Sequence, residues 1–173
     1  MKIHQDAFSS GQIGSKLWLC EQLEKTNWES KETAIYGGWY GLTAFLLLSR
    51  NTFQVEKIKS YDIDPSCQPT ADMINENWLI NSWRFKAYTA NCNLINSDEA
   101  DLIINTSTEH FESMDWFNNI KKGTRVALQG NNMPHEDHVI HSATLEEFVK
   151  RYPLTNTVYV GQKEFRDRKS TRL

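Results

Sequence analysis

Apolar positions along the chain change repeatedly between strand-like runs and helical spacing. Ile13, Leu17, Cys20 and Leu23 recur at helical spacing, which predicts a helix over residues 13–24 with one buried face. Short apolar runs predict six strands, at residues 33–36, 57–62, 84–90, 101–105, 124–128 and 157–160. Further helices are predicted at 42–49, after Pro65 with Ala71, Ile74 and Trp78 on one side, around Met114, Phe117 and Ile120, and from the capping residue Thr144 to about 152.

Strands that alternate with helices through short connections favour a parallel sheet covered on both faces. We therefore predict an α/β protein, a single doubly wound Rossmann-like domain with a mostly parallel sheet of about six strands and helices on both faces. The strand at 84–90 is predicted at an edge. Residues 1–30 are expected to form an N-terminal segment and helix, 31–165 the sheet domain and 166–173 a frayed basic tail. Trp18, Trp78, Trp83 and Trp116 are predicted to pack in the core or between helices and sheet.

Composition narrows the class of protein. The 173 residues suit one domain, and 39% apolar against 24% charged residues exclude the disordered class. A net charge of -3 gives no overall field that would favour nucleic acid. Three widely spaced cysteines without metal-ligand pairing fit a reducing, cytoplasmic setting, and we expect no targeting segment and no membrane span.

Polar and glycine-rich residues follow four of the predicted strands. Three of the eight glycines, Gly37, Gly38 and Gly41, lie directly after the first strand, and Asp62 ends the second. Asn91 follows the third strand and Asn105 the fourth. Ligands of parallel α/β sheets bind outside the carboxyl ends of the strands, so these residues are expected to converge on one crevice. The glycine turn and the acidic strand end together indicate a nucleotide-type ligand.

In this order, the segments 35–41, 61–65, 90–91 and 101–105 resemble the motif series of class I S-adenosylmethionine-dependent methyltransferases, most closely a small, phage-type branch. The resemblance covers about residues 33 to 130 and implies S-adenosyl-L-methionine as the cofactor. It implies that the glycine turn lies against the cofactor's amino acid part, that an acidic residue holds the ribose hydroxyls and that the residue after strand three meets the adenine. The cofactor-binding residues that it assigns are Tyr36, Gly37, Gly38, Gly41, Asp62, Ile63, Asn91 and Asn105, with Gln12, Ser15 or Lys16 of the N-terminal segment folded over the site.

The chain departs from the family pattern in the glycine turn, at the end of strand four, at Asn91, which stands where the family usually has aspartate, and in the incomplete C-terminal hairpin. Bulky Trp39 and Tyr40 stand inside the glycine turn, where they either stack on the ligand or pack beneath the loop. Strand four ends in Asn105-Thr106-Ser107-Thr108-Glu109-His110 and lacks the Asp/Asn-Pro-Pro-aromatic signature of amino-methylating enzymes, so the acceptor is not identified.

Catalytic candidates follow strand four. Asn105 would direct an amide towards cofactor or acceptor, and Glu109 or His110 would act as general base. The alternative is that Glu109 and His110 begin a helix that Ser107 or Thr108 caps.

A second polar cluster, residues 135–141, contains His135, His138 and His141. Three interpretations remain open for it, a zinc or iron site, a lid that faces the substrate, and a solvated surface. Its spacing matches no known metal motif, so no metal is assigned. The amides of residues 129–132 follow strand five and are expected to line the same crevice as the other strand ends.

Three functions remain after these observations. The first is a methyltransferase with an unidentified methyl acceptor. The second is another Rossmann-fold enzyme that uses S-adenosylmethionine for non-methyl-transfer chemistry or uses a nicotinamide cofactor, although the missing Gly-x-Gly-x-x-Gly spacing argues against a dinucleotide. The third is a catalytically silent cofactor-binding module. The expected partners are the small-molecule cofactor and the acceptor, without membrane or nucleic acid, and homo-oligomerisation is left open.

Overall fold

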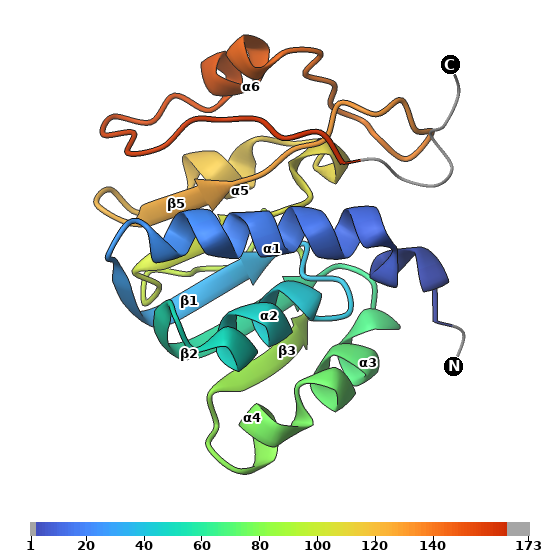
Figure 1. The fold of residues 1–173 in the computed structure, drawn as a ribbon, viewed down its shortest axis with the longest axis vertical. Helices are drawn as coiled ribbons and strands as arrows, with labels where there is room; N and C mark the ends of the chain where they lie inside the picture. The colour runs from blue at the N-terminus through green and yellow to red at the C-terminus, as the bar shows by residue number, and fades with distance from the viewer. Residues whose placement is uncertain (1–2, 166–173) are drawn as a thin grey trace.

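Five parallel strands form one sheet in the order β3-β2-β1-β4-β5, as the computed structural model of residues 3–165 shows (Figure 1). The strands are β1 (Glu29–Tyr36), β2 (Gln54–Asp62), β3 (Phe85–Thr89), β4 (Leu102–Asn105) and β5 (Arg125–Leu128). The strand order reverses between β1 and β4, which places their carboxyl ends at the switch point where such sheets bind ligands. The predicted doubly wound Rossmann-like fold is thus confirmed, with β3 at an edge.

Helices cover both faces of this sheet. The α-helices are α1 (Ser10–Glu24), α2 (Leu42–Arg50), α3 (Cys67–Ile74), α4 (Glu76–Ile80), α5 (Asp115–Asn118) and α6 (Leu145–Arg151), and two 3-10 helices are η1 (Gln5–Phe8) and η2 (Thr108–His110). Helix α1 runs in front of the sheet, between β1 and β5 in this view, with its first turn near the carboxyl ends of the strands (Figure 1). The Thr144 hydroxyl accepts a hydrogen bond from the Glu147 N–H at 3.2 Å and starts α6 as predicted.

Successive side chains of a strand point to opposite faces of the sheet, which divides the core into two layers. Ile35 of β1 and Leu102 and Ile104 of β4 pack with α1, α2 and α3 on one face. Ala34 and Tyr36 of β1 and Ile103 of β4 point to the other face. There they meet a second cluster that contains Trp116 of α5, the loop residues Cys92 and Ala100, and Tyr152 just after α6. Every β4 residue is buried, so this strand is covered on both faces, and its one polar residue, Asn105, lies at its carboxyl end.

Three details differ from the sequence-based expectation. Residues 157–160 form no strand, because the Tyr159 ring packs against Trp18 of α1, 6.3 Å between ring centroids, instead of pairing with the edge of β5. The helix predicted after Pro65 is broken at Asn75, whose buried amide donates to the carbonyl oxygens of Gly41 and Ala71. Of the tryptophans that were predicted to pack in the core, Trp116 is buried. The prediction is wrong for Trp83, which is 76% exposed.

Two further findings concern the described residues. None of their helices has both the length and the apolar character that a membrane crossing requires. All three cysteines are buried and free. The predicted basic tail at 166–173 lies outside the described residues.

Candidate functional site

The turn after β1 lies closely against the end of β2. The Gly38 N–H donates to the Tyr61 carbonyl oxygen at 2.9 Å, and a Cβ added to Gly38 would lie 1.9 Å from the Ser60 hydroxyl oxygen. Gly37 and Gly41 have φ angles of +62° and +74°, a conformation that glycine adopts without strain. Glycine is therefore favoured here by the positive φ angles of Gly37 and Gly41 and by the side chains of Ser107, Ser60 and Asn75, which fill the space that a Cβ would need.

Asp62 connects this turn to the end of β2. Its carboxylate accepts hydrogen bonds from the Trp39 N–H at 2.8 Å and from the Asp64 N–H at 3.0 Å. Burial raises the pKa of Asp62, and the two backbone amides partly offset the rise. A carboxylate offers about four acceptor positions, so about two remain for a ligand that donates from hydroxyl groups.

The bulky residues of the turn pack with the N-terminal segment. Tyr40 is only 3% exposed, and its ring stacks on Trp39 at 5.3 Å and on Phe8 of η1 at 6.3 Å between centroids. The Tyr40 hydroxyl also accepts a hydrogen bond from the His4 N–H at 3.3 Å. Of the two interpretations left open, packing beneath the loop is the one that the structure shows for Tyr40, and η1 covers the turn from outside.

The ends of β2 and β3 present an apolar and an amide side chain. Ile63 is 69% exposed directly after Asp62. The Asn91 side-chain oxygen accepts from the Asn93 N–H at 3.0 Å, and the backbone of Ala90 bonds to Asp62, so these strand ends are held side by side. An exposed isoleucine next to an amide offers both an apolar surface and hydrogen-bonding groups to a planar ligand.

The side chains of Asn105 and Tyr36 are buried and form hydrogen bonds inside the protein. Asn105 is fully buried, its side-chain oxygen accepts from the Ser107 N–H at 2.9 Å, and its amide nitrogen has no partner among the described residues. The Ser107 hydroxyl donates to the Gly37 carbonyl oxygen at 3.2 Å and joins the β4 end to the glycine turn. The Tyr36 hydroxyl pairs with Ser97 at 2.5 Å on the second face of the sheet.

The predicted N-terminal residues lie in the first half of α1. The Gln12 side-chain oxygen accepts from the Lys16 ammonium at 2.5 Å, and the Ser15 hydroxyl donates to the Gln12 carbonyl oxygen. Gln129, after β5, donates from its side-chain amide to the Ser15 carbonyl oxygen at 3.0 Å. Helix α1 is thus attached to the carboxyl edge of the sheet, and the amide of Gln129 is engaged in this attachment.

A polar cluster lies beside the β4 end. Glu109 of η2 is 7% exposed, and burial raises its pKa to about 7. Burial also lowers the pKa of Lys16 to about 8, while the Glu109 charge acts in the opposite direction. The His138 side chain lies against Glu109, with 4.0 Å between Nε2 and Oε1. The expected side-chain cap of this turn by Ser107 is not formed, and the Thr108 hydroxyl donates instead to the Gln129 carbonyl oxygen.

The contact between Glu109 and His138 is the feature that the sequence-based interpretation missed. The two residues were predicted as members of separate clusters, and no fixed spacing connects them. The sequence indicated their proximity only through their positions. Glu109 follows strand four and His138 follows strand five, and these two strands are neighbours in the sheet.

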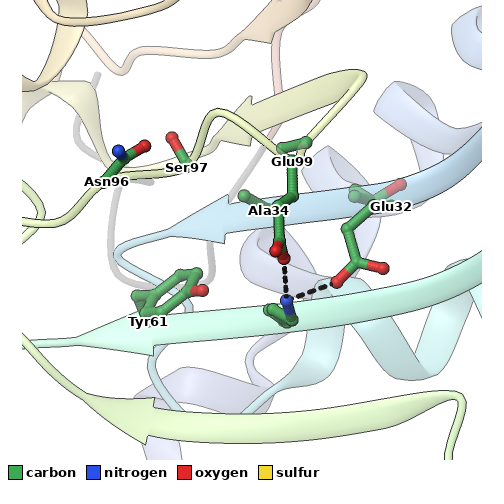
Figure 2. A pocket seen from close by; sticks show the side chains of 9 residues that line it. Glu32, Ala34, Tyr61, Asn96, Ser97 and Glu99 are labelled. Carbon is green, nitrogen blue, oxygen red and sulfur yellow. Dashed lines mark hydrogen bonds and ion pairs between the residues drawn. The ribbon is translucent and has the colours of Figure 1, made fainter.

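A small cavity lies elsewhere and is not part of this site. It has a volume of about 20 Å3, and it is lined by residues of β1, β2 and the loop before β4. The Lys59 ammonium lies between two carboxylates, 2.7 Å from Glu32 and 3.0 Å from Glu99, both of which Figure 2 labels. The cavity has room for about one water molecule, so it cannot hold a nucleotide-sized ligand.

Comparison with known proteins identifies the fold. No protein-family model and no curated protein matches the sequence. Among solved structures, a candidate sarcosine dimethylglycine methyltransferase from Galdieria sulphuraria matches with a TM-score of 0.56 and 16% identity, over 68% of this chain and 46% of that one. Geranyl diphosphate methyltransferase in complex with SAM matches with a TM-score of 0.53 and 13% identity, over 66% and 46%. N-methyltransferase NodS from Bradyrhizobium japonicum in complex with S-adenosyl-L-homocysteine matches with a TM-score of 0.51 and 13% identity, over 64% and 53%.

These identities are low, so the likeness concerns the fold. The chain spans about half the length of the solved structures that it matches. The strand order, the glycine turn at the switch point and these structural neighbours lead to one conclusion. The chain has the Rossmann-like fold of class I S-adenosylmethionine-dependent methyltransferases.

Proposed function

We propose that the protein is an S-adenosylmethionine-dependent methyltransferase whose methyl acceptor is unidentified. The observation that carries the proposal is the meeting of the glycine turn, Asp62 and Asn91 at one edge of a sheet with this fold. Structural neighbours with the same fold are described as complexes with S-adenosylmethionine or S-adenosylhomocysteine.

The residues at this edge fit an adenosyl cofactor. Asp62 keeps acceptor positions for ribose hydroxyls, and the backbone of the glycine turn would lie against the amino acid part. Ile63 and Asn91 would contact the adenine, the first by apolar contact and the second by hydrogen bonding. When bound, the cofactor supplies a methyl group activated by its sulfonium centre.

The chain itself would provide position and shielding. Segment η1 packs on the glycine turn through Phe8 and Tyr40, and α1 is bonded to Gln129 after β5, so the N-terminal segment would help to exclude water from the cofactor's side of the site. The acceptor would approach from the other side, next to η2 and the β4 end, where Glu109 and His110 supply polar groups. Because the reactivity comes with the cofactor, correct orientation of the acceptor provides much of the acceleration.

Isothermal titration calorimetry with S-adenosylmethionine, S-adenosylhomocysteine and NADH tests the proposal. We expect one equivalent of each adenosyl ligand to bind, and we expect no competition from NADH. Transfer of a labelled methyl group to fractions of a cell extract would then reveal the acceptor class. Binding of NADH in preference to the adenosyl ligands would refute the proposal in favour of a nicotinamide enzyme.

A further inference from the structure

Three potential metal ligands from two separate segments meet beside the β4 end. Glu109 and His110 belong to η2, and His138 belongs to the irregular segment after β5. One ligand atom from each lies within 4.8 Å of the other two, and His138 Nε2 and Glu109 Oε1 are 4.0 Å apart. The backbone fixes this arrangement, because the Glu109 carbonyl oxygen accepts from the N–H groups of both Val139 and Ile140 at 3.0 Å.

Both imidazoles are held in the orientation that metal ligands adopt. His138 Nδ1 lies 2.8 Å from the Met133 carbonyl oxygen, and His110 Nδ1 lies 3.0 Å from the Asp137 carbonyl oxygen. A carbonyl oxygen only accepts, so each Nδ1 carries a hydrogen, and in the neutral imidazole each Nε2 then carries a free lone pair. Metal-bound histidines characteristically donate their other ring N–H to such a backbone oxygen, which fixes the ring for coordination.

Glu109 supplies a second, independent observation. Its side chain is 8% exposed, and its Oε2 atom has no hydrogen-bond partner among residues 3–165. The nearby Lys16 ammonium donates to Gln12 at 2.5 Å and not to this oxygen. A buried carboxylate oxygen without a partner is costly, and a cation between the three groups would remove that cost.

We propose that Glu109, His110 and His138 bind one divalent first-row transition ion such as Zn2+, through a carboxylate oxygen and the two Nε2 atoms. Two imidazoles and one carboxylate form a ligand set that holds such ions and leaves an open coordination position. With metal–ligand distances near 2.1 Å, ligand atoms of a tetrahedral site lie about 3.4 Å apart. The Glu109 and His138 atoms, 4.0 Å apart, must therefore approach each other by about 0.6 Å, and the exposed His110 side chain can move towards them.

The other two histidines of the segment provide matched controls. His135 Nδ1 accepts from the Asp137 N–H at 3.2 Å, so its orientation differs from that of the two ligands. The ring of His141 is 6.1 Å from that of His138, and His141 is not part of the ligand cluster. Substitution of either residue removes an imidazole from the same surface without removing a proposed ligand.

The sequence suggested that Glu109 or His110 acts as a general base. As metal ligands they would instead hold the ion, and the ion would bind an acceptor group at its open coordination position. The ion would act there as a Lewis acid. The site itself does not depend on the proposed methyl transfer, because ion binding requires no cofactor. A negative result for the metal site would therefore not refute the proposed methyl transfer, and the reverse also holds.

Metal binding to the full-length, tag-free and chelator-treated protein tests the site. Titration with Zn2+ against a chromophoric chelator should show one equivalent bound, and Co2+ should give the visible absorption of a tetrahedral site. We expect Glu109→Gln, His110→Ala and His138→Ala each to weaken binding by more than about 100-fold, since loss of an outer contact alone costs about 10- to 100-fold. His135→Ala and His141→Ala should bind as the unaltered protein does.

Folding of the variants is checked separately by circular dichroism and thermal unfolding of the metal-free proteins. Glu109→Gln preserves the size of the side chain, and His110→Ala alters an exposed one, so these two keep the test valid even where His138→Ala unfolds. Absence of stoichiometric Zn2+ or Co2+ binding would overturn the proposal. Equal binding by the unaltered protein, Glu109→Gln and His110→Ala would do the same.

Discussion

Replacement of Asp62 by alanine should weaken binding of S-adenosylhomocysteine by about 100-fold. The carboxylate has about four acceptor positions, and the N–H groups of Trp39 and Asp64 occupy two of them. The other two can accept the ribose hydroxyls, and a hydrogen bond to a charged group contributes about 1.5 to 3 kcal/mol. Loss of both bonds at the lower value amounts to about 3 kcal/mol, which is about a 100-fold increase in Kd.

The matched control is Asp64→Ala. Asp64 is an exposed carboxylate two residues further along the chain, and it accepts from the backbone N–H and hydroxyl of Ser66. Calorimetry should give it a Kd within about 3-fold of the unaltered protein, since surface changes away from a ligand have small effects. Circular dichroism must show that Asp62→Ala remains folded, because the substitution also leaves the Trp39 N–H without its acceptor. If folded Asp62→Ala binds as tightly as Asp64→Ala, the ribose assignment is refuted.

Three further substitutions test the packing that shapes the site, each by urea unfolding. Gly38→Ala should lower the free energy of unfolding by about 1 to 3 kcal/mol, because its Cβ meets the Ser60 hydroxyl. Adding Ser60→Ala in the same chain should restore part of that loss. Additive effects of the two substitutions would contradict this contact. Asn75→Ala should cost about 1 to 3 kcal/mol because its buried amide bonds the carbonyl oxygens of the glycine turn and α3, whereas an unchanged unfolding midpoint would show these bonds to be dispensable. Trp116→Ala should cost about 3 to 5 kcal/mol while the exposed Trp83→Ala changes stability by less than about 0.5 kcal/mol, and similar losses for both would contradict the assigned burial.

The sequence was sufficient for the parts of the fold that local pattern determines. Apolar runs such as residues 102–104 are buried on both faces, and that property is visible in the residues themselves. The glycine turn and the acidic end of β2 were recognisable for a similar reason, because backbone conformation and strand position restrict the residue types there.

Features that depend on tertiary contacts could not be predicted in this way. Residues 157–160 have a strand-like composition, but Tyr159 finds its partner on α1 and not at a sheet edge. The break at Asn75 depends on the Gly41 carbonyl, which is distant in the sequence. Similarly, Glu109 and His138 meet only because β4 and β5 are adjacent, so the sequence showed two weak clusters where the structure shows one.

A crystal structure with S-adenosylhomocysteine tests the central claim most directly. The account predicts the ligand at the carboxyl edge of the sheet, with its ribose hydroxyls on the Asp62 carboxylate, its amino acid part against Gly37 and Gly38, and its adenine beside Ile63 and Asn91. A ligand bound elsewhere, or one at this edge whose ribose makes no contact with Asp62, would contradict it.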